Sequence, residues 1–154
     1  MKKVLVVGSA NIDVTMKMNK VPAPGQTLIA DEISKTTGGK GLNQSVAIAR
    51  QGESVTFIGK VGTDDDSKLI KEKLNENGIF SHLLYSSEKQ TGTAYILLEA
   101  DSQNRIILYG GANQDYNTND IEELFSLIDT HDVLLVQLEI SLSILQKVIQ
   151  YIPQ

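Results

Sequence analysis

Three short stretches of this chain are almost continuously apolar, and they restrict the possible fold more than any other feature. Residues 4–7 and 132–138 are the clearest cases, and residues 55–58 form a shorter version. Strands have this composition when both of their faces are covered, as in a parallel sheet with helices on either side. The pattern therefore predicts a parallel sheet.

Helical patterns lie between these stretches. Residues 42–50 and 67–77 show them, and Gly78 is placed to end the second helix. Apolar residues recur at helical spacing from Ile121 to Ile128. Strands that alternate with helices predict right-handed crossovers, and therefore a doubly wound α/β domain.

The end of the chain carries two further expectations. Asn119 lies three residues before Glu122, a plausible capping arrangement for the helix of residues 121–128. Another helix is expected after Ser141, and it ends close to Gln154, so no strand follows it, although a crossover normally leads to another strand. The inward positions of that helix are Leu142, Leu145 and Ile149. We therefore expect residues 1–154 to be the truncated N-terminal portion of an α/β domain.

Two regions do not fit the alternation of strands and helices. Residues 14–37 are polar and are interrupted by prolines, and residues 93–109 have the pattern of two strands joined around residues 101–104. We expect both regions to form antiparallel strands that stand away from the main sheet as a small β lid.

Composition excludes several classes of partner and chemistry. The net charge of -5 disfavours nucleic acid as a partner, and the chain has no cysteine, so it has no disulfide and no thiolate chemistry. The apolar run at residues 4–7 is too short for a signal peptide or a membrane span. We therefore expect a cytoplasmic protein that binds no membrane. The acidic run at residues 64–66 favours the start of a helix over a metal site, so we expect no metal ligands in this chain.

A glycine-rich segment at residues 37–44 is the strongest local feature. Gly39 and Gly41 flank Lys40 just before a helix, where small residues allow close approach to a ligand and the helix start offers N–H donors. The simpler alternative is a tight turn between a strand and a helix. The segment does not match a Walker A loop, because Gly41 stands where Ser or Thr is required, and residues 8–13 lack the glycine spacing of a dinucleotide site.

Polar side chains follow two of the apolar stretches. Asn11 and Asp13 come just after the first strand, and Glu139 comes just after residues 132–138. The carboxyl ends of strands are where open α/β sheets place ligands, and amide and carboxylate groups suit sugar hydroxyls. For Asn11 and Asp13 the alternative is a turn that satisfies only local backbone groups.

Together these segments resemble the ribokinase branch of the PfkB carbohydrate kinase family, over essentially the whole chain. The resemblance rests on the order and spacing of Gly8-Ser9-x-Asn11-x-Asp13, Pro24-Gly25, Gly38-Gly39-Lys40-Gly41-x-Asn43-Gln44, Phe57-Ile58-Gly59, Val61-Gly62-x-Asp64, Thr91-Gly92-x-Ala94, Gly110-Gly111-Ala112-Asn113 and Gln137-Leu138-Glu139. Leu42 departs from the family pattern, in which alanine is usual, and this change should only adjust packing.

The resemblance implies phosphorylation of the 5-hydroxyl of D-ribose by ATP, with Mg²⁺ accompanying the nucleotide and K⁺ as activator. It also implies that the lid closes over the sugar and forms a homodimer interface. The residues that it places at the sugar are Asn11, Asp13, Gly39, Lys40, Gly41, Asn43 and Glu139.

The family's Gly-Ala-Gly-Asp motif, which supplies the general base, has no counterpart in this sequence. Phosphoryl transfer depends on positioning and on stabilising charge around the transferred group. We therefore expect no catalytic residue in these 154 residues and no activity from them alone. Two alternatives remain: a kinase for another sugar or a nucleoside, and a non-catalytic sugar-binding or self-associating module.

Overall fold

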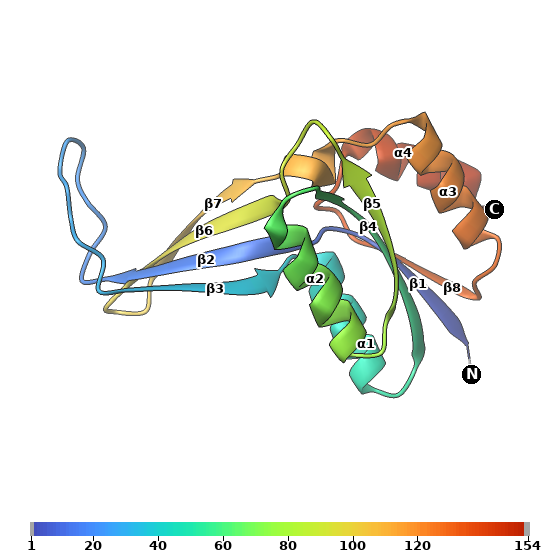
Figure 1. The fold of residues 1–154 in the computed structure, drawn as a ribbon, viewed down its shortest axis with the longest axis horizontal. Coiled ribbons are helices and arrows are strands. Elements are labelled where there is room, and N and C mark those ends of the chain that lie inside the picture. The colour runs from blue at the N-terminus through green and yellow to red at the C-terminus, as the bar shows by residue number, and fades with distance from the viewer. Residues whose placement is uncertain (1, 153–154) are drawn as a thin grey trace.

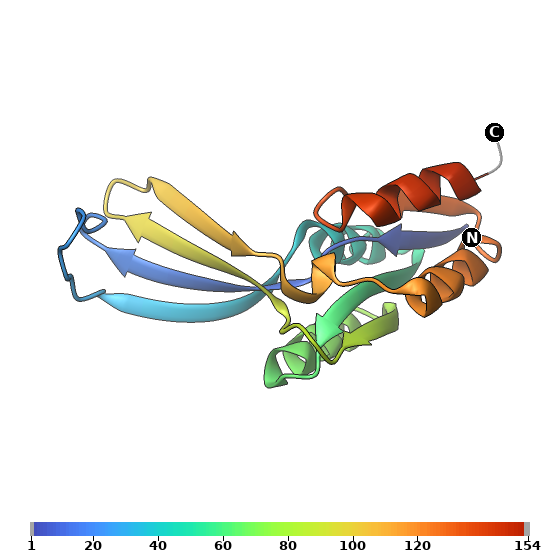
Figure 2. The same cartoon turned by 90° about the horizontal axis from the view of Figure 1, so that it is seen from above.

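The computed structural model describes residues 2–152 and places their strands in two four-stranded sheets (Figure 1). The core sheet has the strand order β5-β4-β1-β8, and the outer sheet has the order β3-β2-β6-β7. The outer sheet extends away from one end of the helix-covered core, as both ribbon views show (Figures 1 and 2).

The core sheet is parallel, as predicted. Its central strand β1 pairs in parallel with β4 on one side and β8 on the other, and β4 pairs in parallel with β5. The strands are β1 (Lys3–Val7), β4 (Ser54–Gly62), β5 (Phe80–Ser86) and β8 (Val133–Val136). The edge strands differ from the prediction. β5 was missed because polar residues interrupt it, and β8 is shorter and less buried than expected, with Val133 39% exposed.

Helices cover both faces of the core sheet, which is the doubly wound arrangement expected from the sequence. One apolar cluster joins α1 and α2 to one face, and the other joins α3 and α4 to the opposite face. Val6 of β1 belongs to the first cluster and its neighbours Leu5 and Val7 to the second, because successive side chains of a strand point to opposite faces. The helices are α1 (Lys40–Arg50), α2 (Asp65–Glu76), α3 (Thr118–Ile128) and α4 (Leu142–Tyr151).

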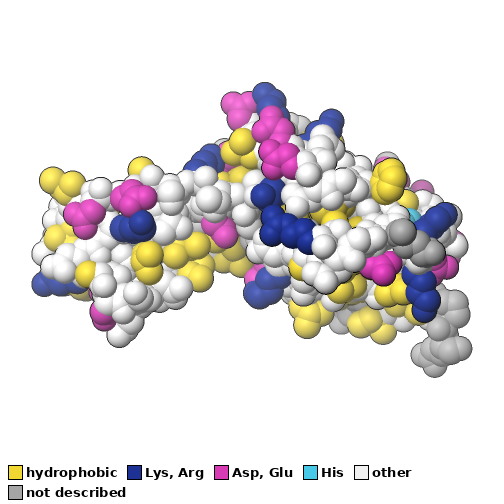
Figure 3. Space-filling model, turned by 90° about the horizontal axis from the view of Figure 1, so that it is seen from below, with side chains coloured by type: hydrophobic (Ala, Val, Ile, Leu, Met, Phe, Trp, Pro, Cys, Tyr) yellow, Lys and Arg dark blue, Asp and Glu magenta, His cyan; other side chains and the backbone are white. Residues whose placement is uncertain are grey.

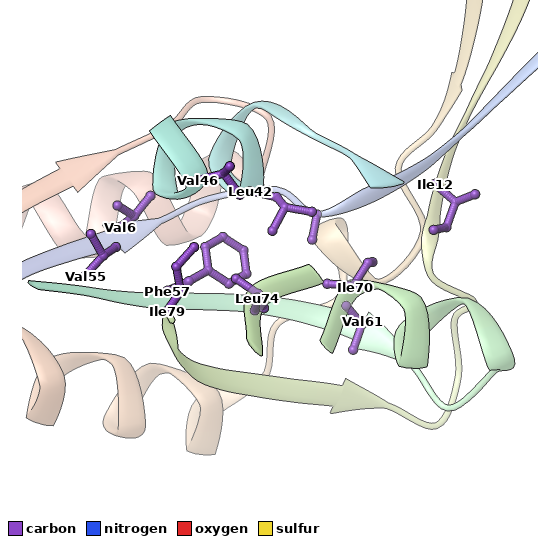
Figure 4. Packing of buried hydrophobic residues seen from close by; sticks show 11 residues of the cluster. Val6, Ile12, Leu42, Val46, Val55, Phe57, Val61, Ile70, Leu74 and Ile79 are labelled. Atoms are coloured by element: carbon purple, nitrogen blue, oxygen red, sulfur yellow. The ribbon is translucent and has the colours of Figure 1, made fainter. Parts of the chain in front are cut away.

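The first cluster is centred on Phe57 of β4, which is fully buried (Figure 4). Leu42 of α1 and Leu74 of α2 point toward it from the helices. Leu42 is itself fully buried, so this departure from the family pattern is accommodated as a packing residue.

Two details of the later helices were predicted wrongly. The cap of α3 is Asn117 paired with Asp120 in a capping box, not Asn119 with Glu122. In α4 only Leu145 of the three predicted inward residues is buried, while Leu142 and Ile149 are 68% and 67% exposed. The buried stripe of α4 is Ile144, Leu145 and Val148. Relative to the prediction, α4 is therefore rotated about its own axis. As a result Leu142 and Ile149 face solvent instead of the core.

The outer sheet contains the predicted antiparallel hairpins, β2 with β3 and β6 with β7. Its central pair, β2 and β6, is parallel, so the prediction of an antiparallel lid was wrong there. The reason is topological: β2 follows β1 and β6 follows β5, and both leave the carboxyl ends of parallel core strands in the same direction. The strands are β2 (Asn11–Met18), β3 (Glu32–Gly38), β6 (Gly92–Glu99) and β7 (Asn104–Tyr109).

The start of α2 connects the core to the outer sheet. Asp64 caps this helix by accepting the Ser67 N–H at 3.2 Å, and it also accepts the backbone N–H and the hydroxyl of Thr91, each at 2.7 Å. Asp66 forms an ion pair with Lys35 of β3. The acidic run therefore begins a helix, as expected from the sequence. It also holds the root of the outer sheet, by which we mean the end next to the core that includes Lys35 and Thr91.

A buried ion pair lies on the opposite side of the core. Lys60 of β4 contacts Asp120 of α3 at 2.5 Å, and the two side chains are 3% and 9% exposed. The Lys60 ammonium also lies 5.9 Å from the centre of the Tyr116 ring. Burial, with the charge of Asp120, raises the pKa of the Tyr116 hydroxyl.

Candidate functional site

A pocket of about 190 Å³ lies where the core and the outer sheet meet. Six of the seven predicted site residues line it, and the seventh, Gly41, is not among the lining residues. The lining residues are Asn11, Asp13, Gly39, Lys40, Asn43, Ala94, Ile96, Ile106, Leu108 and Glu139. Segments from both ends of the chain therefore converge at this pocket.

Asn11 begins β2, directly after the turn that leaves β1, and it is only 4% exposed. Its Oδ1 accepts a hydrogen bond of 2.8 Å from the side chain of Asn113. The Asn11 side chain is thus held by the 3₁₀ turn at Gly111–Gln114, which follows the outer sheet.

Asp13 lies on β2, two positions beyond Asn11, and projects toward the pocket. Gly38 lies beside it on β3, and a Cβ atom at position 38 would come within 2.2 Å of the Asp13 carboxylate. A side chain at position 38 would therefore force the Asp13 carboxylate to move. Partial burial, with the nearby charge of Glu139, raises the pKa of Asp13. Two carboxylates thus face the same small space.

The glycine-rich segment turns the chain from β3 into α1. Gly39 has φ of +92°, a conformation that favours glycine, and a Cβ there would lie 2.8 Å from the Asn11 nitrogen. The Leu42 N–H donates to the Ser9 carbonyl at 3.0 Å, so part of the helix start is used internally. Gly41 packs against the backbone of Gly8, which explains why it does not line the pocket.

Lys40 and Glu139 form an ion pair across the pocket. Ser9, which is fully buried, donates to the Glu139 carboxylate at 2.9 Å, and the Lys40 N–H approaches the same oxygen at 3.4 Å. Partial burial alone would raise the pKa of Glu139, but the hydrogen bonds from Lys40 and Ser9 outweigh it and hold that pKa below its ordinary value. Asn43 lies one helical turn after Lys40 and completes the polar side.

The opposite wall is apolar and comes from the outer sheet. It consists of Ala94 and Ile96 on β6 and Ile106 and Leu108 on β7. The sequence predicted that these strands form a lid, but it did not predict that these residues line the pocket. The available signal was their spacing, because residues two apart on a strand point to the same face.

The site thus combines carboxylate acceptors, amide and ammonium donors, and an apolar wall within one small volume. This combination suits a neutral ligand with several hydroxyl groups, because each hydroxyl both donates and accepts. Within residues 2–152, no cluster of three or more His, Asp or Glu side chains is arranged to hold a metal ion. None of the helices described in this range has the length and apolar character needed to cross a membrane.

Comparison with known proteins agrees with this picture. The model of the pfkB family of carbohydrate kinases matches residues 1–154. The bifunctional ribokinase/ribose-5-phosphate isomerase A of Fructilactobacillus sanfranciscensis is 38% identical, with 91% of this chain and 26% of that protein covered. The ribokinase of Staphylococcus aureus is 37% identical, with 90% of this chain and 46% of that protein covered.

A solved structure of Arabidopsis thaliana ribokinase, complexed with ribose and ATP, superimposes with a TM-score of 0.80 at 31% identity. The match covers 97% of this chain and 49% of that one. The chain therefore spans about half the length, or less, of the relatives that it matches. Because the family model matches from the first residue to the last, the chain belongs to the pfkB family of carbohydrate kinases.

Proposed function

We propose that the chain provides the sugar-binding half of an ATP-dependent kinase that phosphorylates the 5-hydroxyl of D-ribose. The observation that carries the proposal is the convergence of Asn11, Asp13, Lys40 and Glu139 on one pocket with an apolar wall. Relatives named ribokinases and a structural neighbour complexed with ribose and ATP support the choice of ribose and of ATP.

In this proposal some of the polar residues accept hydrogen bonds from the sugar and others donate them. Asp13 and Glu139 accept hydrogen bonds from sugar hydroxyls, whereas Asn11, Lys40 and Asn43 donate hydrogen bonds to the hydroxyl oxygens. Gly39 lets the backbone approach the sugar closely. The outer sheet acts as a lid that covers the apolar face of the sugar and excludes water, which protects the phosphoryl donor from hydrolysis.

In the reaction, the 5-hydroxyl oxygen of ribose bonds to the γ-phosphorus of ATP, ADP leaves, and the hydroxyl proton passes to a general base. The family resemblance places that base, the ATP site and the Mg²⁺ and K⁺ sites outside the sequence given. We therefore assign binding and orientation, but no proton transfer, to these 154 residues, and we expect them alone to consume no ATP with ribose. Turnover by the 154 residues alone would contradict this assignment.

The proposed protein is a cytoplasmic homodimer joined through the outer sheet. Apolar side chains on the face away from the pocket support that interface: Ile33, Ile107 and Tyr109 of the outer sheet are each at least 44% exposed. On the face shown in Figure 3, hydrophobic side chains gather on the part of the outer sheet next to the core. We expect light scattering to report a dimer, and Ile107→Lys to shift it to a monomer; a monomeric unmodified chain would contradict the interface.

The sugar site is tested by replacing Asp13 with asparagine, which keeps its shape and removes its charge. Because hydrogen bonds to a carboxylate are strong, we expect D-ribose to bind about tenfold more weakly or worse in calorimetry. The matched control is Asp31→Asn at an exposed position, which should bind ribose normally. Equal affinity in the chain and its Asp13→Asn variant, or no ribose binding by the chain, would reject the site.

The pH dependence of ribose affinity provides a second test of Asp13. Its pKa is raised, so it becomes protonated at a higher pH than an ordinary aspartate as the pH falls. The lowered pKa of Glu139 keeps that carboxylate charged to a lower pH. Ribose affinity should therefore fall first through Asp13 on acidification, and Asp13→Asn should remove that first step. A first step that persists in Asp13→Asn would show that another group controls it.

A further inference from the structure

Asn113 contacts the sugar pocket only through another residue. It lies in the 3₁₀ turn after β7, is 1% exposed, and is not among the residues that line the pocket. Its side chain nevertheless reaches the point where β1 passes into β2, at Ala10 and Asn11.

Backbone groups fix which way the Asn113 amide faces. Its Oδ1 accepts the Ala10 N–H at 3.1 Å, and its Nδ2 lies 3.2 Å from the Ala10 carbonyl and 3.1 Å from the Gly110 carbonyl. Reversing the amide would place a donor against the N–H and an acceptor against two carbonyls. Only one orientation therefore satisfies these groups.

This orientation determines that of Asn11. Because Asn113 presents its Nδ2, the Asn11 atom 2.8 Å away must be an acceptor, namely Oδ1. The Asn11 Nδ2 is then the atom left for the pocket. Among the described residues it makes no hydrogen bond with the protein and is not a fully buried unpaired atom, so it is open to the pocket.

The contact between the two amides lies directly beside Gly92. A Cβ atom at Gly92 would lie 2.2 Å from the Asn113 Nδ2 and 2.3 Å from the Asn11 Oδ1. The glycine that begins β6 thus makes room for this contact. Asn113 also accepts the Ser141 N–H through its own carbonyl at 3.2 Å, which ties the turn to the start of α4 just after Glu139.

We propose that Asn113 is a positioning residue that sets the Asn11 amide with its nitrogen toward the pocket. The proposal rests on the sugar-kinase function proposed above and adds a specificity rule to it. At Asn11 the sugar meets a donor, whereas at Asp13 and Glu139 it meets acceptors. A hydroxyl that donates to a carboxylate can therefore accept from Asn11, and a ligand group that can only donate is disfavoured at that position.

The test is a double-mutant cycle measured by D-ribose affinity, with Asn11→Ala, Asn113→Ala and the double variant. We expect each single variant to bind ribose about tenfold more weakly, as for a lost neutral hydrogen bond, and the double variant to bind no worse than Asn11→Ala. If Asn113→Ala weakens binding equally in the presence and absence of Asn11, Asn113 has only a structural role and the inference is wrong.

A measurement on the unmodified chain keeps the test valid if Asn113→Ala does not fold. In ¹⁵N-labelled protein, the side-chain NH₂ signals of Asn11 should shift when D-ribose is added, and those of Asn113 should exchange slowly with solvent. Asn11 signals that stay unchanged at saturating ribose would overturn the inference. If the chain binds no ribose, the proposed function fails instead, and fast exchange of the Asn113 NH₂ group would then separately overturn the orientation.

Discussion

The core sheet and the outer sheet have the same number of strands but are stabilised in different ways. Helices cover both faces of the core sheet, and its central strand β1 has Leu5, Val6 and Val7 almost fully buried. In the outer sheet, every residue of β7 is exposed, and so are five of the seven residues of β3. The core is held by buried apolar area, whereas the outer sheet is held by its own backbone ladders and by a few polar contacts at its root.

This difference explains why the candidate site lies at the boundary. The polar residues that must hold their geometry, Asn11 and Glu139, are fixed by buried partners in the core, whereas the apolar wall comes from strands that have few such partners. A region with few buried contacts opens at lower free energy than the core does. Substitutions in the core should therefore change global stability, and substitutions at the root should change local opening of the outer sheet.

The largest effect is expected from Lys60→Met in the core. It leaves the buried Asp120 carboxylate without its partner, which should lower the free energy of unfolding by about 3–5 kcal/mol. Urea denaturation measures this, with Lys68→Met, at an exposed ion pair, as the matched control. A loss no greater than that of the control would mean that the buried pair does not stabilise the core.

The second-largest loss of stability is expected from Gly41→Ala, because Gly41 lies where the core meets the candidate site. A Cβ at position 41 would lie 2.6 Å from the Gly8 carbonyl carbon, and neither backbone can yield easily. We expect a loss of about 1–3 kcal/mol in urea denaturation. The exposed Gln44→Ala on the same helix serves as control, and equal stability of the two variants would show that the contact relaxes without cost.

Asp64→Ala tests whether the outer sheet opens separately from the core. It removes the cap of α2 and both contacts with Thr91, and should cost about 1–2 kcal/mol. Asn117→Ala removes the cap of α3 and should cost about 1 kcal/mol. Only Asp64→Ala should speed hydrogen exchange of β6 amides. The same exchange pattern in both variants would show that Asp64 does not hold the outer sheet.

Lys35→Met should have the smallest effect. The ion pair between Lys35 and Asp66 is partly exposed, so its loss should cost less than about 1 kcal/mol. Lys17→Met, which removes an ion pair within the outer sheet, is the control. We expect faster exchange of β3 amides in Lys35→Met alone, and the difference should shrink at high salt. Equal exchange of the β3 amides in the two variants would show that the ion pair of Lys35 with Asp66 does not connect the outer sheet to the core.

The sequence predicted the buried parts of this molecule better than its edges. Continuous apolar runs identified the central strands β1 and β4 because strands covered on both faces have little room for polar residues. The run at residues 132–138 also located the edge strand β8, but it overstated the length and burial of that strand. Strand β5 was missed because polar residues interrupt it. The buried face of α4 was predicted wrongly because its sequence offers two apolar stripes. Burial leaves a clear sequence pattern, and partial exposure does not.

The candidate site shows the same limit. Its polar residues followed from strand ends, glycine spacing and family resemblance, and six of the seven residues line one pocket. Gly41 was included although it serves packing, because sequence does not distinguish a glycine near a ligand from one near another backbone. Ser9 and Asn113 belong to motifs of the family resemblance, but the sequence predicted no role for either side chain. Their roles depend on contacts with residues more than 100 positions away, which local sequence patterns do not report.

The parallel pairing of β2 with β6 also determines when the pocket can form during folding. Residue 11 lies opposite residue 92, and Asn113 reaches Ala10 across 103 positions, so these contacts close long loops. Hairpins form within microseconds, whereas pairings distant in sequence form late. As the chain is synthesised, β2 has β3 beside it early but gains its second neighbour only after β6 emerges. The candidate pocket is therefore a late product of folding, and a ligand that binds there would stabilise only chains that have completed it.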